Sequence, residues 1–382
     1  CQSILTKFYF SFIELLSRSS TQKALFALLL FMLYQKIIKP ILFSLDPEVA
    51  HELGAKSLNI LGKFRPGCTL LRKLLLCQTN PIEILGLKFP NCIGQAAGLD
   101  KDGHFPIASE AIGFGFVEVG TVTPLSQPGN DKPRLFRIPH KLALVNRMGF
   151  NNDGVEALKN RLDASFPKNK RCIPLGINLG KGKSTPIESA LEDYCAGFDQ
   201  TAHLADYITI NISSPNTQNL RNLQKDEYLE PFLSGIKEYR THWSKLHNLS
   251  SPPCLLKISP DESFKSLEGI IAKAIEHNFD GIVACNTTIQ PNRENMGSKP
   301  LPEGGVSGMP IERRSNEVIK FISKLTDSKL PIIGVGGIHD YESAQRKLDA
   351  GANLLQIYTS FVYNGPLWPS RLAKRIPLAK AW

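Results

Sequence analysis

The chain has 382 residues, of which 42% are hydrophobic and 21% charged. This composition excludes an intrinsically disordered protein, and the length allows a barrel of roughly 250 residues with an appendage. The formal net charge of +10 first suggests a nucleic-acid binder. Because the basic residues form no dense block, we expect no nucleic-acid partner. The eight cysteines and eight histidines are also dispersed, which predicts reduced thiols and no metal site.

Residues 1–39 differ from the rest of the chain. They carry one acid, Glu14, among basic, serine and aromatic residues, which is typical of a mitochondrial transit sequence. Residues 24–34 have no polar side chain, but this run is shorter than the roughly 17–25 residues of a membrane span. A signal-peptide core or a buried helix is one interpretation; an anchor or interfacial helix extending to Ile38 is the other. No small-residue cleavage pattern follows, so we predict a targeting and membrane-anchor segment of the mitochondrial inner membrane.

Residues 40–78 are expected to form a small helical hood of two helices. Asp46-Pro47-Glu48 is a helix start, with Asp as the N-cap and Pro at the first helical position. Apolar residues such as Leu53 and Ile60 fall on one face of that helix up to about residue 62. An apolar stripe over 37–45, interrupted by Pro40, precedes it. The hood either lies in a bilayer surface or packs on the following domain, and the pattern leaves both open.

Residues 79–382 alternate short β-rich runs with helical patterns. The predicted strands are 92–97, 116–121, 173–179, 207–212, 254–258, 281–285, 331–335 and 354–358. Helical patterns lie near 103–112, 152–164, 187–203, 226–246, 263–277, 312–326 and 340–349. Such alternation with apolar strands predicts an α/β protein, a (β/α)8 TIM barrel. Residues 81–90 are expected to form a hairpin that plugs the bottom, and 123–145 an excursion over the top.

Polar residues gather where the predicted strands end. Such barrels build their active sites from the loops at the carboxyl ends of the strands. A lone Asn there is typical of a turn, but Asn178, Asn211 and Asn286 follow three different strands. The amide of Asn offers a donor and an acceptor together, which suits the edges of a pyrimidine or a flavin ring. The pattern therefore favours a planar ligand.

Glycine-rich sequences follow the later strands. Gly336-Gly337 comes after the seventh, Tyr358-Thr359 after the eighth, and Ser307-Gly308 lies in the loop after the sixth. Glycine lets backbone N–H groups approach an anion closely, and this region binds phosphate in many such barrels. Tight turns alone are the alternative. The arrangement predicts a phosphate site.

Two lysines differ in character. Lys257 lies within an apolar strand, and a buried ammonium needs a partner, for which the N1/O2 edge of a reduced flavin is suited. Lys101 follows the first strand and either pairs with a substrate carboxylate or is a solvated loop lysine.

Taken together, the motifs resemble those of the dihydroorotate dehydrogenase family. The resemblance runs from Asp46 to Pro366 and keeps the family's order, with the stretches AAGLDK, GFGFVEVGTVTP, PRLFR, NRMGFNN, LGINLGK, NISSPNT, LKISPD, CNTT, GGVSG, IIGVGGI and IYTSF. Ser214 matches the catalytic base of class 2, the membrane-associated and quinone-dependent class, whereas soluble classes have Cys there. The resemblance implies oxidation of dihydroorotate to orotate in pyrimidine biosynthesis. FMN would be the cofactor, and a membrane quinone, ubiquinone above all, the final acceptor.

The resemblance also implies roles for individual residues. Those expected at the substrate are Lys101, Asn146, Gly149, Phe150, Asn211, Asn216, Asn286 and Thr287. Those expected at FMN are Ala97, Gly98, Thr121, Asn146, Asn178, Asn211, Lys257, Ser307, Gly308, Gly337, Tyr358 and Thr359. Those expected to line a quinone tunnel between hood and barrel are His51, Arg137 and Tyr358. Ser214 would remove a proton from C5 while hydride leaves C6, and either Thr217 or a water beneath Phe150 would carry the proton away.

The sequence departs from the family at several positions. Cys285 stands where relatives often carry Thr beside the flavin, and a thiol is a poorer hydrogen-bonding group than a hydroxyl. Phe43, Phe361 and Val362 also differ from many relatives, so the shape of the tunnel is not carried over.

Three other functions would require features that differ from those of this sequence or behave differently. A 2-hydroxy-acid oxidase would use a His base, and no predicted strand ends in His. An isomerase or synthase barrel would need carboxylates at the strand ends, where only Asp100 and Asp261 lie near. A membrane-tethered binding or scaffold barrel would hold a flavin that dihydroorotate does not reduce.

Overall fold

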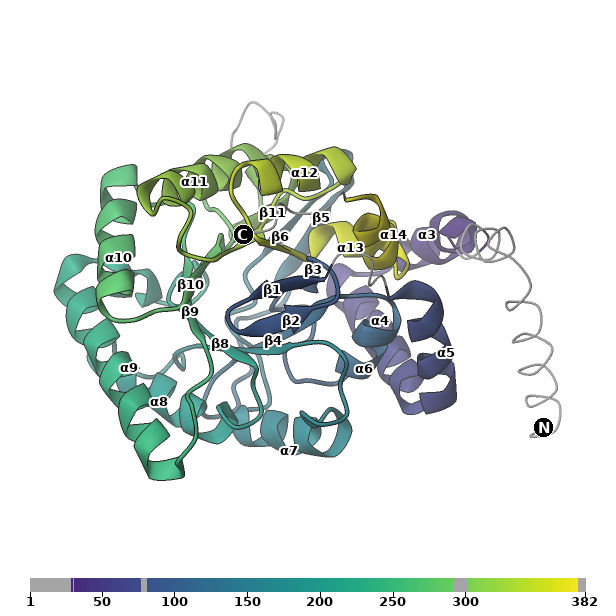
Figure 1. Cartoon of the computed structure of the whole chain (residues 1–382). Coiled ribbons are helices and arrows are strands. Elements are labelled where there is room, and N and C mark those ends of the chain that lie inside the picture. The colour runs from purple at the N-terminus through teal and green to yellow at the C-terminus, as the bar shows by residue number, and fades with distance from the viewer. Residues whose placement is uncertain (1–28, 30, 77–80, 292–300, 377–382) are drawn as a thin grey trace.

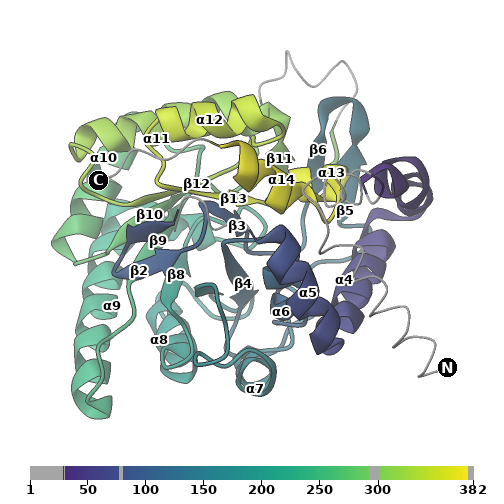
Figure 2. The ribbon, with the colours of Figure 1, turned by 45° about the vertical axis from the view of Figure 1, so that its right-hand side comes forward.

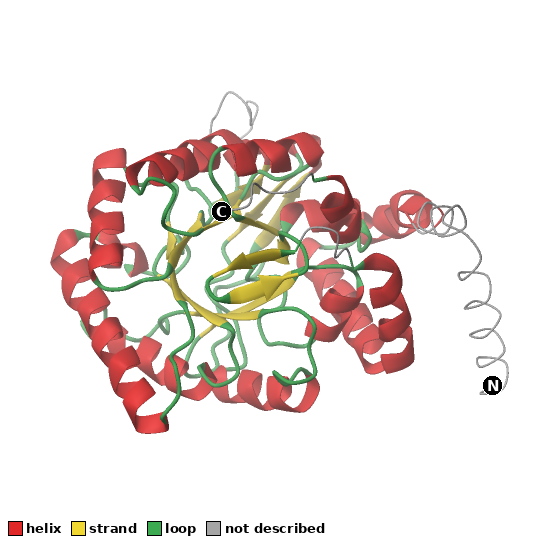
Figure 3. Cartoon of the chain, in the orientation of Figure 1, coloured by secondary structure: helices red, strands yellow, loops and turns green. Residues whose placement is uncertain are grey.

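Eight parallel strands form a closed barrel in a computed structural model that describes residues 29, 31–76, 81–291 and 301–376. Neighbours in the barrel follow chain order, and the last strand pairs with the first. Helices surround this ring (Figure 3), and the predicted (β/α)8 barrel is confirmed. The strands are β3 (Ile93–Gln95), β4 (Phe116–Val122), β7 (Leu175–Leu179), β8 (Tyr207–Asn211), β9 (Cys254–Ile258), β10 (Gly281–Ala284), β12 (Ile332–Val335) and β13 (Leu354–Ile357).

In the outer layer, the first seven helices follow the predicted pattern with small shifts of their ends, and the last two lie beyond the final predicted helix. The helices of this layer are α6 (Pro106–Ala111), α7 (Val155–Ser165), α8 (Ala190–Thr201), α9 (Asp226–His247), α10 (Phe264–Glu276), α11 (Glu312–Leu325), α12 (Tyr341–Asp349), α13 (Thr359–Asn364) and α14 (Trp368–Arg375). The predicted strand 173–179 begins later, at Leu175. Pro174, just before it, has no N–H for the sheet, although its carbonyl accepts a hydrogen bond from Val117 N.

A hairpin closes the amino end of the barrel, as predicted. Its strands β1 (Ile82–Ile84) and β2 (Leu87–Phe89) pair antiparallel and lie across one opening of the strand ring (Figures 1 and 3). Phe89 is fully buried, and its ring lies 5.3 Å from that of Phe116, the first residue of β4. The opposite, carboxyl end is therefore the end available for a ligand.

The barrel interior is filled by a large aromatic layer next to the hairpin. Phe116 and Tyr207 are completely buried, with ring centroids 6.4 Å apart. Each ring occupies the space above a glycine of a neighbouring strand: a Cβ on Gly94 would lie 2.2 Å from the Phe116 ring, and one on Gly176 2.2 Å from the Tyr207 ring. Alternation of large and absent side chains gives the close packing expected of a barrel core.

The predicted excursion over the carboxyl end is a small antiparallel sheet. It contains β5 (Leu135–Ile138) and β6 (Ala143–Asn146), and β6 also pairs with β11 (Gly305–Gly308) from the loop after β10. This sheet brings Asn146 and Gly305 into register. Segments far apart in sequence thus form one wall above the barrel.

The hood consists of η1 (Tyr34–Ile38), α3 (Lys39–Ser44), α4 (Pro47–Lys63) and α5 (Arg65–Leu75). The predicted N-cap is confirmed, because Asp46 Oδ1 accepts hydrogen bonds from Glu48 N and Val49 N, at 2.9 and 3.2 Å. Pro40 lies in the first turn of α3 and does not interrupt the apolar stripe. Helix α5 was not foreseen. Figure 2 shows α4 and α5 beside α6, on one side of the barrel.

The predicted anchor lies mostly outside the described residues, since only Leu29 and residues from Phe31 on are described. Among the described residues, no helix combines the length and apolar character needed to cross a bilayer.

Candidate active site

A cavity opens at the carboxyl end of the barrel. Residues from most of the predicted ligand-binding stretches meet there. The predicted catalytic base, Ser214, lines it, and so does the whole predicted substrate set: Lys101, Asn146, Gly149, Phe150, Asn211, Asn216, Asn286 and Thr287. Of the residues predicted at the cofactor, those that line it are Ala97, Gly98, Thr121, Asn146, Asn211, Lys257, Ser307, Gly308, Gly337, Tyr358 and Thr359. Asn178 does not line the cavity but donates and accepts hydrogen bonds just beneath it.

One end of the cavity is shaped by glycine backbone and hydroxyl groups. Ser307 Oγ and Thr359 Oγ1 are 2.8 Å apart. Gly337 has a φ of +80°, and a Cβ there would lie 2.2 Å from Glu312 Cα. Only glycine fits this approach, and the backbone here lines the cavity together with the two hydroxyls, which is an arrangement of the kind that binds phosphate. These residues fit the phosphate of a flavin mononucleotide.

The base of the cavity holds a buried cation. Lys257 is 5% exposed, and burial lowers the pKa of its ammonium, while Glu118 acts in the opposite direction. Among the described residues, no hydrogen bond or ion pair joins its Nζ to another group. A buried ammonium is stabilised by a nearby anion, which suits the electron-rich edge of a flavin ring. Cys285, the departure from the family, lines the same region, and burial raises its thiol pKa to about 12.

A hydrogen-bonded set of amides lies between this lysine and the loops. Asn211 Nδ2 donates to Thr121 Oγ1 and Asn178 Oδ1, at 3.0 and 3.1 Å. Asn211 Oδ1 accepts from Asn286 Nδ2 at 3.2 Å. Across the cavity, Asn216 Nδ2 donates to Asn146 Oδ1 at 3.1 Å. The predicted convergence of Asn residues is thus borne out in space.

Ser214 and Lys101 face the same cavity from different loops. Ser214 is 5% exposed, and its Oγ accepts from Asn216 N at 3.3 Å. Lys101 Nζ donates to Asn151 Oδ1. Burial, assisted by the charge of Arg134, lowers the pKa of Lys101 to about 8. Lys101 is therefore part of the cavity wall, and its interpretation as a solvated loop lysine is wrong.

A second cavity lies between hood and barrel and is lined mostly by apolar residues. All three residues predicted for the tunnel line it: His51, Arg137 and Tyr358. The His51 and Tyr358 rings are stacked, with centroids 6.3 Å apart. Burial lowers the pKa of His51 to about 4, so its ring is neutral at pH 7. Phe43, Phe361 and Val362, the other departures from the family, also line this cavity.

The two cavities share a wall. Tyr358, Leu135 and Leu144 line both. Arg137 Nη1 donates to Leu42 O at 2.9 Å, and its Nη2 donates to Leu45 O, which fixes the end of α3 to β5. The hood cavity therefore reaches one edge of the barrel cavity through a thin layer of side chains.

Some residues of the site were missed by sequence reasoning. Gln356 lines the cavity, and Asn151 holds Lys101. Glu118 lies beneath, completely buried within β4. A single polar residue in an apolar strand was the signal that identified Lys257, and the same signal was present at Glu118 and Gln356.

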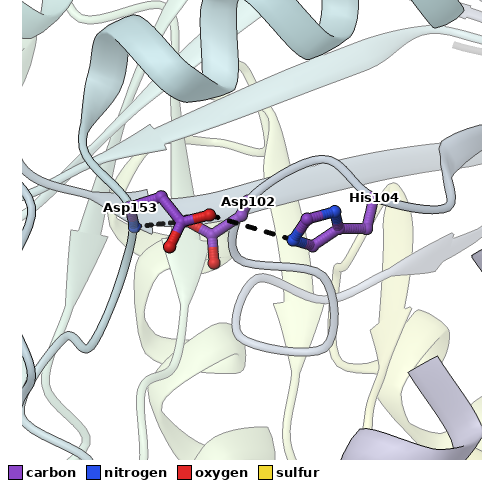
Figure 4. A group of neighbouring side chains, drawn as sticks. All are labelled: Asp102, His104 and Asp153. Carbon is purple, nitrogen blue, oxygen red and sulfur yellow. Dashed lines mark hydrogen bonds and ion pairs between the residues drawn. The ribbon is translucent and has the colours of Figure 1, made fainter. Parts of the chain in front are cut away.

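Two groups in the described residues have the spacing for a metal ion: Asp102, His104 and Asp153 (Figure 4), and Glu230, Glu276 and His277. In the first, Arg161 already pairs with Asp153. In the second, Lys273 pairs with Glu230 at 3.0 Å. Since a cationic side chain already pairs with one carboxylate of each group, we assign no metal to either.

The fold and this cavity define a (β/α)8-barrel enzyme with a phosphate cradle, a buried lysine and a serine among amides. The chain belongs to the dihydroorotate dehydrogenase family, whose model matches residues 80–379. It is 46% identical to a "Dihydroorotate dehydrogenase (quinone)" of Idiomarina loihiensis over 86% of this chain and 96% of that protein. It is 44% identical to a protein of the same name from Dechloromonas aromatica, over 90% and 98%.

Solved structures agree with this assignment. A DHODH from Eimeria tenella in complex with ferulenol has a TM-score of 0.74 at 32% identity, covering 85% of this chain and 89% of that one. The ligand-free DHODH from the same organism has a TM-score of 0.75 at 32% identity, covering 87% and 94%. The family is one of flavin-dependent oxidoreductases.

Proposed function

We propose that this chain oxidises dihydroorotate to orotate with FMN as its flavin and passes the electrons to a membrane quinone. The convergence of a phosphate cradle, Lys257 and Ser214 in one cavity carries this proposal. When bound, FMN supplies the acceptor for the hydride that leaves the substrate. Its phosphate would be held by the backbone at Gly308 and Gly337 and by the hydroxyls of Ser307 and Thr359.

The residues of the chain bind and orient the substrate. Lys101 pairs with the substrate carboxylate, and the amides of Asn146, Asn211 and Asn286 bind the edges of its ring. This fixed orientation would hold the substrate ring in one position for transfer to the cofactor.

Ser214 removes the proton from the substrate carbon. A serine hydroxyl is a weak base and has to pass the proton on. Thr217 Oγ1 is buried without a hydrogen-bond partner among the described residues, and it lies three residues along the same loop. We assign it to the path by which the proton leaves.

The hood cavity binds the quinone. Its wall is largely apolar, and His51, Arg137 and Tyr358 supply the polar groups for quinone carbonyls. Because Tyr358 lines both cavities, electrons cross only a short distance between flavin and quinone. Ubiquinone is the quinone we propose.

The hood lies on a lipid bilayer. Large apolar side chains are exposed there, at 53% for Ile37, 59% for Ile41 and 69% for Ile60. Such a surface is typical of an interfacial membrane helix. With the transit-like composition of residues 1–39, this supports a location at the mitochondrial inner membrane. Flotation with liposomes tests the surface: Ile37→Ser with Ile41→Ser should reduce co-flotation, and Leu125→Ser, at an exposed apolar residue elsewhere, should not.

Anaerobic titration of the purified protein tests the reaction. Dihydroorotate should bleach the yellow flavin absorbance, and a short-chain ubiquinone should restore it in the absence of oxygen. Mass spectrometry of the released cofactor distinguishes FMN from FAD. A colourless protein, or a flavin that dihydroorotate leaves oxidised, contradicts the proposal.

A further inference from the structure

A buried carboxylate lies under the amides of the cavity and has no role in the proposed reaction. Glu118, in the middle of β4, is completely buried and does not line the cavity. Its carboxylate accepts hydrogen bonds from residues of β7, β8 and β13. The donors are Asn178 Nδ2 at 2.7 Å, Gln356 Nε2 at 2.8 Å, and the hydroxyls of Tyr207 and Thr209 at 3.1 Å. Such contacts across the ring are possible only inside the barrel.

The carboxylate determines which way the neighbouring amide points. An ionised carboxylate only accepts hydrogen bonds, and four donors stabilise the charge. Asn178 must therefore turn its Nδ2 toward Glu118 and its Oδ1 toward the cavity. That oxygen accepts from Thr121 Oγ1 at 2.6 Å and from Asn211 Nδ2 at 3.1 Å.

The orientation continues to the substrate side. With its Nδ2 engaged by Asn178 and Thr121, Asn211 directs its Oδ1 to the opposite side. There it accepts from Ser213 Oγ at 3.0 Å and from Asn286 Nδ2 at 3.2 Å. Each amide in the series is fixed by the one below it, and the first is fixed by a charge that cannot donate.

We infer that Glu118 is a positioning residue, which sets, through Asn178, the donor and acceptor pattern that Asn211 and Asn286 present to flavin and substrate. It acts through these amides without touching either ligand. Its negative charge also lies near Lys257, whose ammonium it stabilises. This inference rests on the proposed function, because it assumes that a flavin binds above the amides.

Replacement of the carboxylate by its isosteric amide tests the inference. Glu118→Gln keeps the shape but places an NH2 group against a ring of donors, so at least one neighbouring amide has to reverse or lose its partner. We expect flavin binding to the stripped protein to weaken about tenfold or more. The midpoint potential of the bound flavin should become more positive, since a nearby negative charge has been removed. The KM for dihydroorotate should rise more than kcat falls.

Thr209→Val is the matched control. It removes one hydrogen bond to the same carboxylate and keeps both its charge and its bond to Asn178. Both Glu118→Gln and Thr209→Val weaken the hydrogen bonding in the same buried layer, so both proteins should unfold at a lower temperature than the wild type. Only Glu118→Gln should change the flavin affinity, the potential and the KM.

Glu118→Asp keeps the negative charge, but its shorter side chain places the carboxylate farther from Asn178. This variant replaces Glu118→Gln in the test if Glu118→Gln does not fold. It should weaken flavin binding with a smaller change in potential. The result that would overturn the inference is a folded Glu118 variant whose flavin affinity and KM equal those of Thr209→Val. The proposed function would remain intact in that case. A wild-type protein that binds no flavin, or whose flavin dihydroorotate does not reduce, overturns both.

Discussion

Glu48 of the hood and Arg134 of the barrel excursion form a buried ion pair, in which Arg134 Nη2 donates to Glu48 Oε1 at 2.8 Å. Each side chain is 8% exposed. Arg134 Nε also contacts both carboxylate oxygens, and its Nη1 donates to Pro128 O and Asn130 O, at 2.6 and 2.8 Å. Asn130 Nδ2 in turn donates to Asn216 O at 3.1 Å. The hood is thereby connected to the loop that carries Ser214.

Glu48→Gln should therefore destabilise the protein. Removal of one partner leaves the other charge buried and unpaired, which lowers the free energy of unfolding by about 3–5 kcal/mol. Chemical denaturation measures the loss. Lys132→Met is the control, since Lys132 is 60% exposed at 3.3 Å from Glu48, and we expect less than about 1 kcal/mol there. Equal losses in the two variants would contradict a buried, dominant Glu48–Arg134 pair.

The ion pair of Glu48 and Arg134 also predicts that the stability of the protein depends on pH in the acid range. Burial alone would raise the pKa of Glu48, but Arg134 and Lys132 together hold it below its usual range. The unfolded carboxyl therefore binds its proton first as pH falls. The stability from this pair is complete above the ordinary glutamate pKa and is lost as pH falls toward the lower, folded value. Glu48→Gln should show a smaller loss of stability than the wild type over that acid range.

Ser214→Ala should slow the reduction of the flavin by dihydroorotate. Loss of a general base reduces a rate by roughly 10²- to 10⁴-fold. Stopped-flow absorbance under anaerobic conditions measures this step by itself. Reoxidation by quinone is the internal control, because it takes place on the hood side and should keep its rate. Full-rate flavin reduction in the variant would remove Ser214 from its role.

The lowered pKa of Lys101 predicts that kcat/KM decreases on the alkaline side of its pH profile. Burial lowers the pKa of Lys101 to about 8, so the side chain is charged below that pH and neutral above it. Since a neutral amine no longer attracts the substrate carboxylate, kcat/KM should fall above about pH 8. This ratio reports ionisations of the free enzyme. Lys101→Arg should move this decrease to higher pH, whatever the absolute activity. A decrease that stays in place would assign it to another group.

Most of the architecture could be predicted because the relevant signals are local. The prediction for the strand at 254–258 agrees with β9 at both ends, since an apolar run interrupted only by Lys257 marks a strand buried on both faces. The N-cap at Asp46 likewise needs only three neighbouring residues. Helix α5 was missed because it begins Arg65-Pro66-Gly67, and Pro-Gly is also typical of a turn.

The polar interior could not be predicted in the same way. Glu118 was visible as one acid in an apolar strand, but its partner Gln356 is 238 residues away. Only closure of the barrel brings the two together. The ion pair of Glu48 and Arg134 is equally non-local, because the two residues are 86 positions apart in the sequence. Composition and spacing identify which residue types are present at the strand ends, whereas contacts across the barrel depend on the fold.

Gly337→Ala should damage the phosphate cradle. The left-handed φ of +80° costs a non-glycine residue about 1–3 kcal/mol. The added Cβ, 2.2 Å from Glu312 Cα, forces the backbone of the cradle to shift as well. We expect lower thermal stability together with a loss of bound flavin, measured by the ratio of flavin to protein absorbance after purification.

Gly54→Ala provides the opposite case in the same protein. Gly54 lies within α4, and a Cβ there would meet nothing within 4 Å. Alanine in a helix interior should stabilise the protein by about 0.5–1 kcal/mol relative to glycine and leave flavin content unchanged. Because the two substitutions add the same methyl group, the contrast assigns the loss to the local conformation and close packing at Gly337. A Gly337→Ala protein with full flavin content would show that the cradle tolerates a side chain, and that the phosphate is bound elsewhere.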